Sequence, residues 1–152
     1  MRDGLLAVVV GFTVLLSLRR AAQWWARQAG RRRLRGATVL RAAYGVRVGA
    51  LVQDKRAFPR LNPKRRTRLT GDLFLTQDRL LLVTQRGVLL DLPRSSAGHL
   101  TGARAPGPGR LVLEGRAPGQ AEGLGLFRFE LSIDESAAWA AALTDFVQPA
   151  SA

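Results

Sequence analysis

The sequence predicts a mainly β domain that ends in an α-helix and follows one N-terminal transmembrane helix. Three observations support this fold class. Residues 5–18 form an uncharged apolar run. From Thr38 onward, apolar residues recur in short runs with a period of two, separated by turn residues, as in antiparallel sheets. Residues 137–147 are rich in strong helix formers.

The length of 152 residues leaves room for one domain of ordinary size besides an anchor. We expect a membrane anchor with a basic juxtamembrane helix over residues 1–35, a β domain over 36–148 and a short tail over 149–152. The sequence contains no cysteine, which excludes disulfides, thiolate zinc sites and cysteine nucleophiles and fits a reducing compartment.

The apolar run would extend for about 21 Å as a helix, which is shorter than the roughly 30 Å hydrocarbon core of a bilayer. Arginines at its end can extend their aliphatic stems through the apolar layer, and Trp24 and Trp25 follow where interfacial aromatics are expected. The alternatives are an interfacial or protein-buried helix and a cleaved signal peptide. A signal peptide would carry its positive charge before the run, whereas here the arginines follow it.

Positive charge on the C-terminal side of the run sets the expected orientation. By the positive-inside rule, the N-terminus lies outside and the rest of the chain lies in the cytoplasm, next to the cell membrane. Near the surface, each such residue also attracts anionic lipid by about 1 kcal/mol. The juxtamembrane basic residues are Arg19, Arg20, Arg27, Arg31, Arg32, Arg33 and Arg35.

The net charge of +13 comes entirely from the first half of the chain. Residues 1–71 hold 17 Lys and Arg against two Asp, whereas residues 72–152 hold 7 Lys and Arg against 9 Asp and Glu. This asymmetry indicates an anionic partner, either a lipid surface or a nucleic acid.

Alternating apolar residues predict the strands. One to two strands are expected within residues 39–52, followed by a three-stranded meander over 69–75, 80–83 and 88–92 and a strand at 111–113. The clearest strand contains Phe127 and Ile133, with apolar and polar residues alternating between them.

The C-terminal segment predicts a helix that packs against the open end of the sheet. Trp139, Leu143 and Phe146 share one helical face. Ser132 or Asp134 would cap the helix, with Glu135 at capping-box distance from Ser132.

The order of these elements resembles the pleckstrin-homology (PH) superfold, specifically the GRAM-like and bacterial PH-like domains. The residues that carry the resemblance are Gly71 to Thr76, Arg79 to Val83, Gly87 to Pro93 and the closing helix with Trp139. The resemblance covers 38–147. It implies a partly open barrel of about seven strands, closed at one end by the helix, that binds phosphoinositides, other acidic lipids or proteins without catalysis.

A basic loop follows the first predicted strands and is interrupted by Pro59 and Pro63. Several cations on one loop could contact one phosphorylated surface, although a solvated charged loop is the simpler interpretation. Lys55 followed by Arg66-Thr67-Arg68 is also similar to the basic motif of many phosphoinositide-binding PH domains. The candidate lipid or phosphate contacts are Lys55, Arg56, Arg60, Lys64, Arg65, Arg66 and Arg68.

Residues for catalysis are sparse. His99 is the only histidine, so neither a metal site nor a triad forms around it from the usual residues. Asp72, Asp78 and Asp91 occupy strand or turn positions where an outward-facing acid needs no functional explanation. The sequence predicts no cofactor, no metal and no enzymatic activity.

We therefore expect a membrane-tethered, non-catalytic binding module that contacts acidic lipid headgroups or a membrane-protein partner. An assembly scaffold, in which a sheet edge pairs with a strand of another protein, is the alternative. Nucleic-acid binding is less well supported, because the basic loop lacks interleaved aromatic residues. Ligand, pathway and oligomeric state are left open.

Overall fold

The computed structural model describes residues 32–120 and 124–148, together with Ser17, Arg20, Ala21, Trp24, Trp25, Gln28 and Gly30. Each of the seven isolated positions is helical. Except for Ser17, the apolar run predicted to be an anchor lies outside the described residues. No helix within the described part is both long and apolar enough to span a bilayer.

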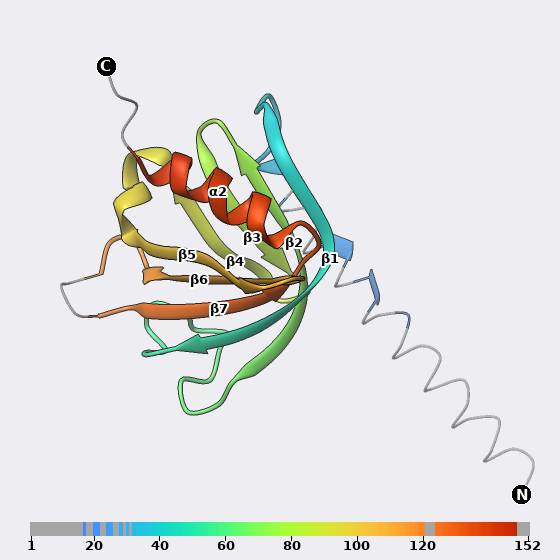
Figure 1. Cartoon of the computed structure of the whole chain (residues 1–152). Helices are drawn as coiled ribbons and strands as arrows, with labels where there is room; N and C mark the ends of the chain where they lie inside the picture. Colours follow the sequence, from blue (N-terminus) through green and yellow to red (C-terminus); the bar gives the residue numbers. More distant parts are fainter. Residues whose placement is uncertain are drawn as a thin grey trace, which may run out of the picture.

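The folded part is one seven-stranded antiparallel sheet followed by a helix, which confirms the mainly β class (Figure 1). The strand order is β4-β3-β2-β1-β7-β6-β5. The predicted three-stranded meander is confirmed as β2, β3 and β4. The strands are β1 (Val39–Val52), β2 (Thr67–Thr76), β3 (Arg79–Thr84), β4 (Gly87–Pro93), β5 (Leu100–Gly107), β6 (Arg110–Arg116) and β7 (Leu126–Ser132).

Strand β1 joins the two halves of the sheet. It pairs with β2 from Val39 to Ala50 and with β7 from Arg47 to Val52. The β1–β2 register shifts between Ala43 and Val46, where Gly45 has a φ of 66°. A bulge of this kind bends a strand and increases its twist, so one strand can belong to both halves. Figure 1 shows β1 curving along the whole sheet.

Asp72 on β2 supports this bulge; it lies on the outer face of the sheet, as expected, but is only 2% exposed. Its carboxylate accepts a hydrogen bond of 2.9 Å from the Gly45 backbone N–H. The buried acid therefore satisfies a backbone donor that the bulge removes from the strand ladder.

We predict that Asp72→Ala lowers the free energy of unfolding by about 1 kcal/mol, because it removes the acceptor of the partly buried hydrogen bond from the Gly45 N–H. Asp72→Asn keeps an acceptor oxygen and should lose less. Urea unfolding of both variants measures the difference. Equal losses would show that the hydrogen bond to Gly45 is not what Asp72 contributes.

The inner face of the sheet forms the main core. Phe129, Leu131 and the other inward residues of β7 are buried and alternate with polar neighbours, as predicted. Helix α2 (Ser136–Val147) closes this core and contacts β5, β6 and η1 (Arg94–His99), a short 3-10 helix. Its predicted face is confirmed, because Trp139, Leu143 and Phe146 are at most 3% exposed.

The predicted cap of this helix was wrong. Ser132 belongs to β7, and the N-cap is Glu135, which has a φ of 53° and makes no side-chain capping bond. Instead, the Ser136 hydroxyl donates to the Gly107 carbonyl oxygen at 3.1 Å. The helix start is therefore fixed by a tertiary contact with the end of β5, which local sequence spacing does not reveal.

A second apolar cluster lies on the outer face of the meander. Phe74, Leu81 and Val83 are buried there and pack with Leu34. Gly30 lies directly over Val83, because a Cβ atom at Gly30 would collide with both γ-methyl groups of that side chain. Residues that precede the sheet thus cover its outer face. We call Gly30 together with residues 32–36 the strap.

Candidate functional site

A cavity of the described part lies between the strap, the β1–β2 loop and the β3–β4 turn. It measures about 510 Å³, and we call it the arginine cavity. Its cations are Arg33 from the strap, Arg60 from the loop and Arg86 from the turn. The remaining lining residues are Ala57, Phe58, Pro59, Leu61, Thr84, Gly87, Val88 and Leu89.

Arg60 and Arg86 tie the loop to the turn through reciprocal hydrogen bonds. The Arg60 guanidinium donates to the Arg86 carbonyl oxygen, and the Arg86 guanidinium donates to the Arg60 carbonyl oxygen at 2.9 Å. Each bond uses a neutral acceptor, and neither side chain forms an ion pair within the described part. Both guanidinium groups therefore line the cavity without an acidic partner among the described residues.

Arg33 connects the cavity to the strap. Its guanidinium donates to the Asp91 carboxylate on β4, which also pairs with Arg79 at 3.3 Å. The Asp91 side chain is 19% exposed, so this three-residue cluster is partly shielded from solvent. The ion pair therefore holds the strap against β4 while Arg33 lines the cavity.

Phe58 anchors the loop that carries Arg60. It is 5% exposed and contacts Phe127 and Phe129 edge to face, with ring centroids 5.9 and 5.8 Å away. At the start of the loop, the Asp54 carboxylate accepts hydrogen bonds from the backbone N–H groups of Arg56 and Ala57. The loop is thus fixed to the core rather than being only a solvated charged segment.

The charge balance of the cavity favours an anionic ligand. Three guanidinium groups and no carboxylate are among its lining residues. The planar guanidinium matches the geometry of phosphate and carboxylate oxygens, and apolar walls strengthen such contacts by excluding water. The cavity can therefore bind an anion with an apolar portion.

The structure distributes the predicted loop cations over three places. Arg60 lines the arginine cavity, whereas Arg66 and Arg68 line a separate groove on the outer face of the sheet. The remaining loop cations are exposed and line neither the cavity nor the groove; they are Lys55, Arg56, Lys64 and Arg65. Arg86 was not predicted, because it stands alone in a turn 26 residues from Arg60.

The predicted N-terminal residues are described only in part. Arg19, Arg27 and Arg31 lie outside the described residues. Trp24 and Trp25 are 56% and 62% exposed and contact each other edge to face at 5.6 Å. The predicted juxtamembrane arginines that the structure describes are all exposed; they are Arg20, Arg32, Arg33 and Arg35.

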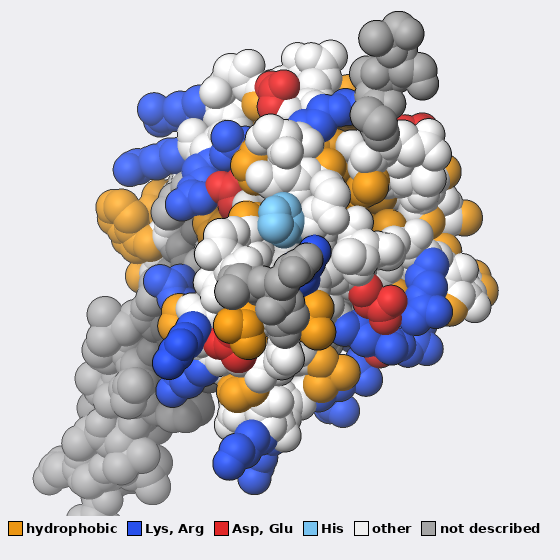
Figure 2. Space-filling view, turned by 90° about the vertical axis from the view of Figure 1, so that its left-hand side faces the viewer, with side chains coloured by type: hydrophobic (Ala, Val, Ile, Leu, Met, Phe, Trp, Pro, Cys, Tyr) orange, Lys and Arg blue, Asp and Glu red, His pale blue; other side chains and the backbone are white. Residues whose placement is uncertain are grey.

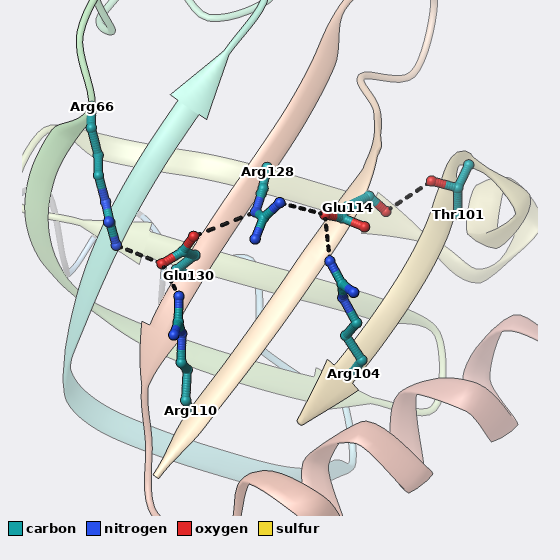
Figure 3. A network of polar contacts seen from close by, with 7 residues as sticks. All are labelled: Arg66, Thr101, Arg104, Arg110, Glu114, Arg128 and Glu130. Atoms are coloured by element: carbon teal, nitrogen blue, oxygen red, sulfur yellow. Dashed lines mark hydrogen bonds and ion pairs between the residues drawn. The ribbon is translucent and has the colours of Figure 1, made fainter. Parts of the chain in front are cut away.

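An ion-pair network crosses the outer face of strands β1, β7, β6 and β5 (Figure 3). Glu130 pairs with Arg66 at 2.7 Å, Arg110 at 2.8 Å and Arg128 at 3.4 Å. Glu114 joins Arg128 to Arg104. Burial alone would raise the pKa of Glu130, but the Arg110 hydrogen bond and the three guanidinium charges outweigh it and lower the pKa below 4.5.

We predict that Glu130→Gln lowers the free energy of unfolding at pH 7 by about 1 kcal/mol, because three arginines lose their shared partner. A lowered folded-state pKa stabilises the fold above the unfolded pKa, and this stabilisation is lost as pH falls through the folded pKa. Urea unfolding should therefore show the gap between the two proteins closing below about pH 4.5. A gap that persists at acid pH would contradict the ionic origin.

The described residues contain no group of three His, Cys, Asp or Glu side chains that could hold a metal ion. His99 is partly buried, and its Nδ1 has no hydrogen-bond partner within the described part. Figure 2 shows this histidine among mostly uncharged atoms, with Lys and Arg side chains toward the edges of the same face.

Comparison with known proteins gives no family assignment, because no family model matches the chain and no curated protein matches its sequence. Its function is therefore argued from the cavity itself.

Proposed function

We propose that this protein is a membrane-tethered, non-catalytic binding module whose arginine cavity binds acidic lipid headgroups at the cytoplasmic face. The observation that carries the proposal is the composition of the cavity lining, which has three arginines, several apolar residues and no carboxylate. One of its arginines, Arg33, follows Trp25 by only eight residues in the sequence. A cavity this close to an anchored segment would lie within reach of headgroups.

The fold supports the same proposal. Seven antiparallel strands followed by one helix agree with a PH-like, partly open barrel, in which β1 belongs to both halves and α2 covers the core. The arginine cavity lies beside the β1–β2 loop and the β3–β4 turn. In this proposal the sheet is a scaffold, and its loops and strap supply the ligand contacts.

The tether is tested by membrane fractionation followed by alkaline carbonate extraction. We compare the full chain with a chain beginning at Gln28, which keeps Gly30 and Leu34 and so preserves the strap contacts. The full chain should stay in the membrane pellet and the shorter chain should be released. Release of both would remove the spanning helix from the proposal.

The ligand is tested by titrating the chain that begins at Gln28 with vesicles. Vesicles that contain phosphatidylserine or a phosphoinositide should bind it, and purely phosphatidylcholine vesicles should not. Binding should weaken with added salt, because exposed ionic contacts are screened. Equal binding to neutral vesicles would exclude recognition of acidic headgroups.

Assembly with a membrane protein is the second candidate. Residues 39–46 of β1 pair with β2 only, since β7 joins β1 from Arg47 onward. Val39, Leu40 and Tyr44 are 43–65% exposed along this stretch. A strand added here would extend the sheet from β1 and cover these side chains. A partner that is still captured after Arg60→Glu and Arg86→Glu, but lost after Leu40→Lys, would favour this candidate.

A further inference from the structure

A second basic site lies on the outer face of the sheet, separate from the arginine cavity. A groove of about 450 Å³ crosses β2, β1 and β7 and shares no lining residue with the arginine cavity. We call it the sheet groove. Its cations are Arg47, Arg66 and Arg68, and its only carboxylate is Glu130.

Strand register brings two of these arginines together. Arg47 lies opposite Thr70 on β2 and Ser132 on β7, and the next outward residue of β1, Gly49, lies opposite Arg68. Arg47 and Arg68 are therefore diagonal neighbours on one face of the sheet, with about 7–8 Å between their Cα atoms. The exposed hydroxyl-bearing residues Thr70 and Ser132 flank Arg47 on the neighbouring strands.

Gly49 allows Arg66 to form its ion pair with Glu130. A Cβ atom there would lie 2.5 Å from the Arg66 Nε, so the missing side chain lets Arg66 lie across β1. Arg66 then reaches Glu130, as Figure 3 shows. Glu130 is fully used by Arg66, Arg110 and Arg128. Arg47 and Arg68, in contrast, form no ion pair within the described part of the chain.

We propose that the sheet groove binds a phosphate monoester between Arg47 and Arg68, with the Thr70 and Ser132 hydroxyls as further donors. Two planar guanidinium groups and two hydroxyls suit a tetrahedral dianion. No aromatic residue lines the groove, so it offers no stacking surface for a nucleobase. The monoester could belong to a lipid headgroup or to a soluble phosphate.

The test uses the full chain in nanodiscs of neutral lipid, titrated with inorganic phosphate while NMR follows the amides of Gly49 and Thr70. Saturable shifts are expected. Phosphate binding should weaken by about tenfold or more in the double variant Arg47→Gln with Arg68→Gln. The reason is that a charge-assisted hydrogen bond contributes more free energy than a neutral one does. The matched control, Arg56→Gln with Arg65→Gln, removes the same charge from exposed loop positions that line neither space and should bind phosphate normally.

Absence of saturable shifts, or equal weakening in both double variants, would overturn the proposal. If the Arg47 and Arg68 variant does not fold, Ser132→Ala with Thr70→Val replaces it and should also weaken phosphate binding. A second arm places a phosphatidylinositol monophosphate or phosphatidylserine in the nanodisc. Shifts with the phosphoinositide alone identify a lipid source, and shifts with free phosphate alone identify a soluble one. Because the two sites share no residue, failure here leaves the arginine cavity untouched.

Discussion

Charge reversal at the arginine cavity, Arg60→Glu with Arg86→Glu, should weaken binding to acidic vesicles by about 30-fold or more. Each basic residue near an anionic surface contributes about 1 kcal/mol, and reversal adds repulsion to the loss of attraction. Both arginines line the cavity without an acidic partner in the described structure. Vesicle co-sedimentation of the chain that begins at Gln28 measures the change.

The matched control is Arg56→Glu with Arg65→Glu. These residues lie on the same loop and are exposed, but they do not line the cavity. The net charge changes by the same amount, so a simple attraction between a basic protein and an acidic surface would weaken equally in both variants. Equal losses would therefore argue against a specific role for the cavity.

Removal of the loop anchor, Phe58→Ala, should lower the free energy of unfolding by about 3–5 kcal/mol. The ring is buried against Phe127 and Phe129, so the substitution leaves a cavity in the core. Vesicle binding should also weaken although no charge is removed, because Arg60 and its bond to Arg86 would no longer be held in place. Urea unfolding and vesicle titration provide the two readouts.

Leu143→Ala on α2 is the control for stability alone. Leu143 is fully buried in the same core but lies outside the cavity, and its loss should cost about 2–5 kcal/mol. Under conditions where both variants stay folded, only Phe58→Ala should bind vesicles poorly. Normal binding by Phe58→Ala would show that the loop keeps its position without this ring.

The strands that the sequence predicted best have one apolar face and one polar face. Strand β7 fits this description, with Phe127, Phe129 and Leu131 inward. Strand β5 was missed because it is an edge strand that pairs only with β6, and Leu100 is its only buried residue. A strand with so little buried surface has no period-two pattern to detect.

Sequence spacing predicted the loop cations but not the way they are grouped. The arginine cavity combines residues 33, 60 and 86. These residues come together only because strands β1, β2, β3 and β4 lie side by side in the sheet and the strap docks on it. Arg66 lay in the predicted cluster but is committed to Glu130, 64 residues away. Charge density along a sequence therefore indicated the region, whereas strand register decided which cations are available.

Local sequence patterns also did not predict which residues cover the outer face of the sheet. The continuous run from Leu80 to Val83 is buried on both faces of the sheet, yet it does not indicate what covers the second face. Gly30 and Leu34 do so from about 50 residues upstream. Their contacts make the strap part of the folded unit and place Arg33 at the cavity.

The most direct test of the central claim is the position of the arginine cavity relative to the bilayer. The full chain is placed in nanodiscs that contain acidic lipid and a headgroup spin label, and NMR measures the broadening of amide signals. The amides of Gly87 and Val88 at the cavity should broaden much more than that of Leu143 on α2. Equal broadening, or stronger broadening at Leu143, would contradict a cavity that faces the headgroups.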